Sequence, residues 1–429
     1  MLIVSVFAGM GVSCKKEMFN EQTYNEILDK VSPVDSVDPN HKWELSTTKY
    51  LLITANAGVG TQKVQILSAD PAVSTTSEVL AQVFINEGEI VGLNVSYPSI
   101  LTTLYAAAVD EAGNYTIVSF KPSNRDVDFS NPIHKQVKLN TIPGLFYYSY
   151  CFEYEFPEPG DYDYNDVVLH IALERAAARL MKIHVRLAAV GATQSLASCI
   201  CLPDYPFNDI DSIYTVGDQS FNKGIKQQYM TVLDKTDLLL EGLSGEAVIN
   251  LFADAHWATG DILEADNGII KRKTYNVVKP GSTNSDNQIM VPREITYVIR
   301  VKDDNQLNGL AMDRLDPFII RLYGNARMEI HTYNYCNADL AKGNKHAQVL
   351  YNYTYSSKDH LPWALKVPMT YFNHPTEGVN MGFSMKDNET DILFGAYDKQ
   401  GHSFGEWSMD RNKCLDWYGY PNESNVFVW

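Results

Sequence analysis

Short apolar segments, each bounded by turn-forming residues, recur along the chain and restrict it to a β-rich fold. The first set lies between residues 46 and 130, at 50–55, 63–67, 78–85, 90–95, 101–109 and 115–120. Gly, Asn, Asp or Pro bounds each segment, which is typical of strands and their turns. Strands that follow one another at this spacing, without helices between them, predict an immunoglobulin-like β-sandwich.

Residues 146–429 continue the β pattern after a polar connector at 131–145. Residues 181–187 alternate apolar and basic side chains, as expected for a strand with one buried face. Residues 167–173 form an unbroken apolar run, which suits a strand buried on both faces. Further strands are expected at 294–301, 318–322 and 327–333, and long loops at 202–228 and 258–290. The fold class is therefore mainly β, with two sandwich regions, the second also compatible with a jelly roll.

The N-terminus has the features of an exported, lipid-modified protein. Residues 2–10 are apolar, and Gly11-Val12-Ser13 then leads to Cys14 and two lysines. A short apolar run ending in small residues is typical of a signal peptide, and the placement of Cys14 resembles a bacterial lipobox. No Lys or Arg precedes Leu2, which departs from the usual signal-peptide start. We expect a signal peptide at 1–13 and a lipidated Cys14. A tether at 14–45, with a short helix at 21–31, would then lead to domains at 46–130 and 146–429.

Charge and cysteine content exclude some classes of partner and site. The net charge of −17 argues against nucleic-acid binding, because such binding depends on basic patches. Five cysteines follow Cys14, and an odd number cannot all pair within one chain. Cys199 and Cys201, two residues apart on an expected loop, lack the second pair that a zinc site needs. These cysteines are expected to be structural thiols, with at most one or two disulfides.

The strongest chemical signal is the acidic stretch from Glu153 to Asp166. Asp161, Asp163 and Asn165 occupy alternate positions, so that their oxygens could converge while the tyrosines between them point away. Ca²⁺ binds six to eight such oxygens. The predicted ligands are Glu155, Asp161, Asp163, Asn165 and Asp166, and the candidate remote or supporting ligands are Asp316, Glu329 and His331.

Two other interpretations of these residues stay open. The EF-hand pattern is incomplete, because Asp166 stands at the usual glycine position and Ala172 at the position of the last glutamate. The stretch could instead be a turn in which Asp and Asn side chains bond to the backbone. Glycoside hydrolysis would need two opposed carboxylates, for which the candidates are Asp163, Asp166, Glu329 and Glu377.

From this acidic stretch onward the chain resembles the LruC-domain family, uncharacterised lipoproteins abundant in Bacteroidetes. The resemblance runs in order through residues 161–168, 187–192, 250–256, 315–319 with 329–331, 361–368, 372–377 and 416–418, and it includes the entry 37–43. Glu155-Phe156-Pro157-Glu158 stands where the family usually has a Glu-Asp pair. The resemblance implies a surface or periplasmic lipoprotein and brings no known activity.

These observations together predict a non-enzymatic lipoprotein at the outer membrane or cell surface, although the periplasmic face stays open. It would be held to the membrane by its lipid, stabilised by Ca²⁺, and bind a glycan or protein ligand. The alternatives are a component of a surface assembly, whose strand at 421–429 would add to a neighbour's sheet, and a carbohydrate-active enzyme. The C-terminal aromatics could form a sugar platform, but we expect them in the core because Trp and Tyr bury large areas.

Overall fold

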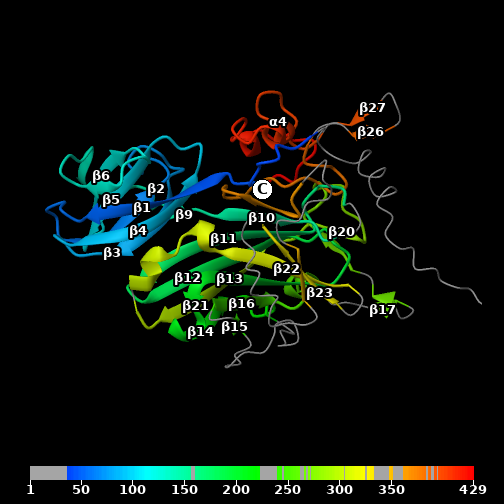
Figure 1. Ribbon diagram of the computed structural model, residues 1–429, viewed down its shortest axis with the longest axis horizontal. Coiled ribbons are helices and arrows are strands. Elements are labelled where there is room, and N and C mark those ends of the chain that lie inside the picture. Colours follow the sequence, from blue (N-terminus) through cyan, green and yellow to red (C-terminus); the bar gives the residue numbers. More distant parts are fainter. Residues whose placement is uncertain are drawn as a thin grey trace, which may run out of the picture.

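Most of the described chain is folded into β-sheets, and the predicted mainly β fold class is confirmed (Figure 1). The computed structural model describes residues 36–429, except for 156–159, 223–238, 244–245, 261–264, 267–268, 271, 304, 324–325, 333–346, 351–360, 383–384, 388–390 and 394. Within these ranges, no helix has both the length and the apolar character needed to cross a bilayer.

The first region contains two sheets. A three-stranded sheet has the order β4-β1-β7, with β1 (Ser46–Thr54), β4 (Ile90–Pro98) and β7 (Asp126–Asp128). A six-stranded sheet has the order β8-β6-β5-β2-β3-β9, with β2 (Thr61–Leu67), β3 (Glu78–Phe84), β5 (Leu104–Asp110), β6 (Tyr115–Phe120), β8 (His134–Val137) and β9 (Gly144–Leu145). All six strands expected here are present. The short strands β8 and β9 lie within the stretch expected as a connector.

The turn between β5 and β6 shows why the sequence folds into these hairpins. The Asp110 carboxylate accepts hydrogen bonds from the backbone N–H of Asn114 at 2.8 Å and from its side-chain amide at 2.9 Å. Gly113 has a φ of +76°, a conformation that costs glycine little. This turn therefore joins β5 and β6 into an antiparallel hairpin.

The second region is a sandwich of two six-stranded sheets. The first sheet has the order β14-β21-β12-β11-β10-β25, with β10 (Tyr148–Phe152), β11 (Val167–Ala177), β12 (Leu180–Ala189), β14 (Ile210–Gly217), β21 (Arg293–Val301) and β25 (Ala364–Val367). The second has the order β15-β16-β13-β22-β23-β24, with β13 (Leu196–Pro206), β15 (Leu240–Leu243), β16 (Glu246–Phe252), β22 (Asp316–Tyr323), β23 (Ala326–His331) and β24 (Ala347–Leu350).

Period-two alternation builds the core between these sheets. Ile183, Val185 and Leu187 on β12 are at most 1% exposed and belong to one buried cluster with Ile200 on β13 and Ile319 on β22. Burying one such side chain contributes about 1.5–3 kcal/mol. The sandwich therefore rests on the alternation that the sequence shows at residues 181–187.

A buried ion pair connects the two regions. The Asp313 carboxylate accepts hydrogen bonds from Ser46 and Thr48 of β1 at 2.5 and 2.8 Å, and it pairs with Lys366 of β25 at 2.5 Å. Burial opposes ionisation of this carboxyl, yet the Lys366 ammonium and the two hydroxyls lower its pKa. The first strand of the first region is thus fixed to the second region.

Several sequence-based expectations need correction. Cys199 and Cys201 lie on strand β13 instead of a loop, because their small apolar side chains pack on the outer face of the second sheet with Phe318. Strands β13 and β14 also occupy part of 202–228, so that stretch is not one long loop. Cys151, Cys199, Cys201 and Cys414 are free thiols. Cys14 and the helix expected at 21–31 lie outside the described residues.

Candidate metal centre

The hairpin between β10 and β11 positions the acidic residues. The two strands are antiparallel and Phe152 pairs with Val167, so Glu153 and Asp166 come next at the open end. The backbone N–H of Tyr154 donates to the Asp166 carboxylate at 2.8 Å. A side chain thus joins the two strands beyond their last backbone pair. We call the described residues of this connection, 153–155 and 160–166, the acidic loop.

Two tyrosines in the acidic loop determine which way the carboxylates face. Tyr162 and Tyr164 are fully buried in the hydrophobic core, and the Tyr164 hydroxyl donates to the Pro362 carbonyl at 2.9 Å. Their φ values are 61° and 53°, a left-handed conformation that costs a non-glycine residue about 1–2 kcal/mol. Such strain is typical of functional loops that the surrounding structure holds in place.

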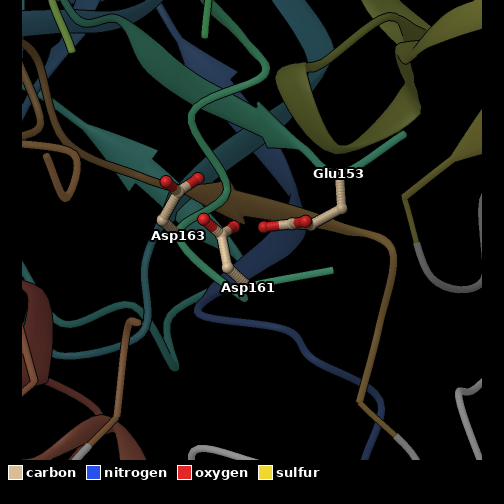
Figure 2. A group of neighbouring side chains, drawn as sticks. All are labelled: Glu153, Asp161 and Asp163. Atoms are coloured by element: carbon tan, nitrogen blue, oxygen red, sulfur yellow. The ribbon is translucent and has the colours of Figure 1, made fainter. Parts of the chain in front are cut away.

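The acidic loop brings five carboxylates together in two overlapping sets. Ligand oxygens of Glu153, Asp161 and Asp163 all lie within 4.8 Å of one another, and Figure 2 shows these three side chains pointing toward a common centre. Oxygens of Glu153, Glu155 and Asp166 form a second set with the same spread. Four of the five predicted ligands therefore converge, and Glu153 joins them.

Backbone N–H groups fix the orientation of two further carboxylates, as the Tyr154 N–H does for Asp166. Glu153 Oε1 accepts from the N–H of Tyr164 at 2.6 Å. The two oxygens of Asp163 accept from the N–H groups of Asn165 at 3.0 Å and Gly378 at 2.9 Å. The bond to Asn165 is the Asx-type turn expected as the alternative to metal binding. It orients the carboxylate and still leaves lone pairs on its oxygens, so the two interpretations are compatible.

Two buried carboxylate oxygens of the loop accept no hydrogen bond from the described residues. These are Glu153 Oε2 and Glu155 Oε2, and both are sealed from solvent. Gly160 lies so close to Glu153 that a Cβ atom at this position would be 2.2 Å from Oε2. Because buried polar atoms are usually satisfied, these two oxygens indicate a missing partner.

The electrostatics of the loop also indicate a missing positive charge. Burial, followed by the charges of neighbouring carboxylates, raises the pKa values of Glu153, Asp163 and Asp166 well above their usual range. Burial is also the main reason that the pKa values of Glu155 and Asp161 are raised. In the described part of the chain, no ion pair joins any of these five carboxylates to a Lys, Arg or His. Protons or a bound cation would relieve the repulsion among these carboxylates.

A sixth carboxylate lies near the loop from the C-terminal part of the chain. Desolvation, then the charges of Asp161 and Glu155, raise the pKa of Glu377 to about 7. The residue itself is exposed, so we regard Glu377 as a charge at the rim of the cluster. Met381 N–H also donates to the Tyr162 carbonyl at 2.8 Å, so the C-terminal segment is attached directly to the loop.

Asn165 is placed differently from the other predicted ligands. Its side-chain amide donates to the Pro375 carbonyl at 3.2 Å. A Cβ atom on Gly191 would be 2.0 Å from its Oδ1, so the side chain is tightly enclosed. The structure therefore gives Asn165 a role in joining the loop to the C-terminal segment.

The three remote candidates form a separate buried group on the second sheet. His331 Nδ1 lies 2.8 Å from Asp316, and its Nε2 lies 3.5 Å from Glu329. Burial raises the pKa of Asp316 to about 6, although His331 opposes the shift. No contact recorded among the described residues joins this group to the acidic loop. The structure thus brings these three residues together with one another and not with the predicted ligands.

Another acid–histidine pair, formed by Asp254 and His256, caps a helix. Asp254 precedes helix α2 (Ala255–Ala258) and accepts from the backbone N–H of His256 at 2.8 Å. Ser195 donates to the Asp254 carboxylate and not to His256, so these residues do not form the relay of a serine nucleophile.

Glu153 and Glu377 are the neighbours that sequence reasoning left out of the ligand set. Glu153 could have been found from the hairpin, because pairing the apolar run before it with the run from Val167 places it beside Asp166. Glu377 lies more than 200 residues further along the chain, and no local pattern indicates its position.

A family model and a solved structure are similar to this chain. Residues 178–384 match a family model described as "Domain of unknown function (DUF4842)". One solved structure, of a candidate lipoprotein from Bacteroides ovatus, is 15% identical and aligns with 86% of this chain and all of its own, with a TM-score of 0.46. No curated protein matches the chain.

Proposed function

We propose that the protein is a lipid-anchored, non-catalytic binding module of the bacterial surface, stabilised by Ca²⁺ in its acidic loop. One observation carries the calcium part: five carboxylates, three of them buried and two half-buried, come together with no ion-paired Lys, Arg or His among the described residues. An uncompensated buried charge is costly, so a loop of this kind favours the binding of a cation.

The donor set favours calcium over other common cations. Every ligand candidate in the acidic loop offers carboxylate oxygen, and no His or Cys belongs to either set. Zn²⁺ prefers nitrogen and sulfur, whereas Ca²⁺ accepts a flexible shell of oxygens. Mg²⁺ requires a near-ideal octahedron and usually keeps several waters, which suits a crowded, enclosed set of side chains less well.

The proposed anchor and location rest on the N-terminal sequence. The apolar run at 2–10 followed by Val12-Ser13-Cys14 supports lipidation of Cys14, after which the chain would be tethered to the outer membrane. Membership of the LruC-domain family, which the ordered resemblance supports, is part of the same proposal. A surface location suits a protein or glycan ligand, and the acidic charge disfavours nucleic acid.

A non-catalytic role is favoured over the two alternatives. The candidate carboxylates at 163 and 166 lie in one crowded loop with three others, an arrangement that serves a cation better than opposed acid and base groups. The C-terminal tail packs on its own chain, since the Phe427 N–H donates to the His374 carbonyl at 2.9 Å. The tail is therefore a poor candidate for donation to a neighbouring subunit.

Calorimetric titration of the metal-free protein with calcium chloride tests the proposal. We expect saturable binding and a higher melting temperature, both lost in Glu153→Gln. Glu111→Gln, the same change on the exposed β5–β6 turn, should behave as the wild type does. A flat titration with an unchanged melting temperature would refute the calcium role.

A further inference from the structure

We propose that the acidic loop holds two cations that share the carboxylate of Glu153, an inference that rests on the proposed calcium role. One cation would be bound by Glu153, Asp161 and Asp163, and the other by Glu153, Glu155 and Asp166. Glu153 would then bridge the two ions, as a carboxylate with two oxygens can.

The spacing of the oxygens supports two centres. Ca²⁺–oxygen distances are about 2.3–2.6 Å, so ligands on opposite sides of one ion lie about 5 Å apart. Each set of three spreads over no more than 4.8 Å and therefore fits around one ion. The five carboxylates form two sets that overlap only at Glu153, and do not form a single set of five.

The charge of the loop also favours two cations. Five ionised carboxylates carry a charge of −5, which one divalent cation reduces to −3 and two reduce to −1. Three of these residues are buried and the other two are half-buried, and water screens repulsion poorly between charges that protein encloses. A single cation would thus leave most of the repulsion in place.

The unsatisfied oxygens identify where the bridging takes place. Glu153 is fully buried, and its Oε1 is held by the Tyr164 N–H while Oε2 has no hydrogen-bond donor. In Figure 2 this carboxylate extends toward Asp161 and Asp163. Glu155, whose Oε2 also has no donor among the described residues, belongs to the other set. Each proposed position therefore contains a buried oxygen that a cation would satisfy.

The deciding experiment is the calcium stoichiometry of the full chain, measured by native mass spectrometry and by calorimetry with calcium chloride. We expect two ions for each wild-type chain. Asp161→Asn and Glu155→Gln should each retain one ion, because each removes a ligand from one set only. Glu111→Gln should retain two.

The possible results separate this inference from the proposed function. A stoichiometry of one in the wild type, lost altogether in both Asp161→Asn and Glu155→Gln, would overturn the two-cation inference and keep the calcium role. No binding at all would overturn both. Melting curves of each variant, recorded with a chelator, show whether it is folded. Terbium luminescence sensitised by Tyr162 and Tyr164 provides a second count of bound ions.

Discussion

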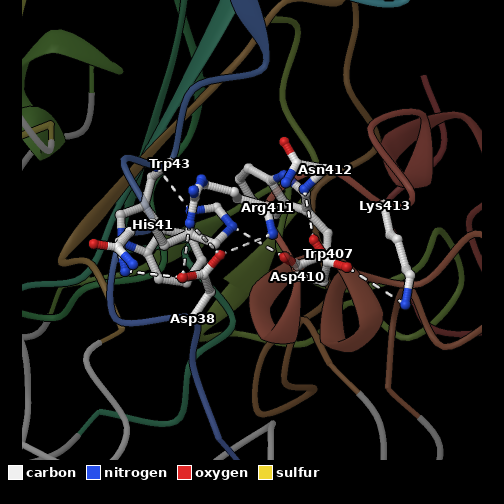
Figure 3. Close-up of polar contacts among 9 residues, drawn as sticks. Asp38, His41, Trp43, Trp407, Asp410, Arg411, Asn412 and Lys413 are labelled. Carbon is white, nitrogen blue, oxygen red and sulfur yellow. Dashed lines mark hydrogen bonds and ion pairs between the residues drawn. The ribbon is translucent and has the colours of Figure 1, made fainter.

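Arg411 Nη1 lies 2.9 and 2.7 Å from the two carboxylate oxygens of Asp38, although 373 residues separate them in the chain (Figure 3). This contact fixes the segment that enters the first region to the residues after helix α4 (Phe404–Met409). Asp38 N–H also donates to the Ser408 carbonyl at 2.8 Å. The described chain thus begins on the C-terminal part of the protein before it forms β1.

Aromatic rings strengthen the attachment of this entry segment. Trp43 is 4% exposed and packs against Trp407 at a centroid distance of 5.3 Å. We expect Trp43→Ala to lower the free energy of unfolding by about 3–5 kcal/mol, as other large aromatic deletions do. Tyr50→Ala, which alters a side chain on β1 that is 53% exposed, should change it little. Denaturant unfolding checks both, and equal effects of the two changes would contradict this packing role.

His41 should make the entry segment sensitive to acid. Its Nδ1 accepts the Trp43 N–H at 2.9 Å, and its Nε2 must therefore donate to the Trp407 carbonyl at 3.0 Å. Burial and the charge of Arg411 lower the pKa of His41 from 6.5 to about 4, although the Trp407 carbonyl, Asp38 and Asp410 oppose the shift. The folded state therefore binds this proton less readily than the unfolded state.

The sign of the His41 effect follows from that difference. Stability should fall as the pH decreases from about 6.5 to about 4 and level off below, with a total loss of about 3 kcal/mol from this group. The variant His41→Asn keeps an acceptor for the Trp43 N–H and cannot be protonated. The wild type should lose its stability advantage over this variant as the pH falls. A difference that stays constant from pH 7 to pH 4 would refute the assignment.

Gly160→Ala should weaken calcium binding without unfolding the protein. The added Cβ would be 2.2 Å from Glu153 Oε2, and the end of that side chain can move away. Moving this carboxylate should raise the dissociation constant for calcium about tenfold or more, and a tenfold change corresponds to about 1.4 kcal/mol. Gly144→Ala is the matched control, since a Cβ at that position meets nothing within 4 Å. Calorimetry would contradict the geometry if both variants bound calcium equally well.

Lipidation of Cys14 can be tested in a bacterium that processes lipoproteins. Wild-type protein should incorporate labelled palmitate and sediment with membranes, because two or more acyl chains anchor a protein stably. Cys14→Ser should lose the label and become soluble, whereas Cys414→Ser should keep it. Label retained by Cys14→Ser would place the lipid on another residue, and a wild-type protein without label would refute lipidation.

Many of the strands could be predicted because the patterns that indicate them, alternating side chains and turn residues, lie within short stretches of sequence. Alternation at 181–187 and the turn at 110–114 fix β12 and the β5–β6 hairpin without reference to the rest of the chain. The run Cys199-Ile200-Cys201 was wrongly predicted as a loop, because three apolar residues in succession do not show the alternation of apolar and polar side chains that indicates a strand. Its strand becomes evident only from its pairing with β16 and β22.

The candidate site was predictable only in part, for a related reason. The alternate spacing of Asp161 and Asp163 identifies them as ligand candidates in the sequence. Glu153 joins the ligand set only because of the register of β10 against β11. Glu377, and the contact between Asp163 and Gly378 N–H, depend on a segment more than 200 residues away. The same applies to the pairing of Asp38 with Arg411. Contacts of this kind are set by the fold and have no signature in the neighbouring sequence.

The central claim, that a cation neutralises the buried carboxylates of the acidic loop, is tested most directly by the melting temperature of Glu153→Gln with and without calcium. Glutamine keeps the shape and the acceptor for the Tyr164 N–H and removes one buried negative charge. With a chelator, the variant should melt at or above the temperature of the wild type, because repulsion is relieved. With calcium at about 100 times its dissociation constant, the wild type should gain about 2.7 kcal/mol for each ion bound and become the more stable protein. If calcium stabilises both proteins equally, or neither, the claim is wrong.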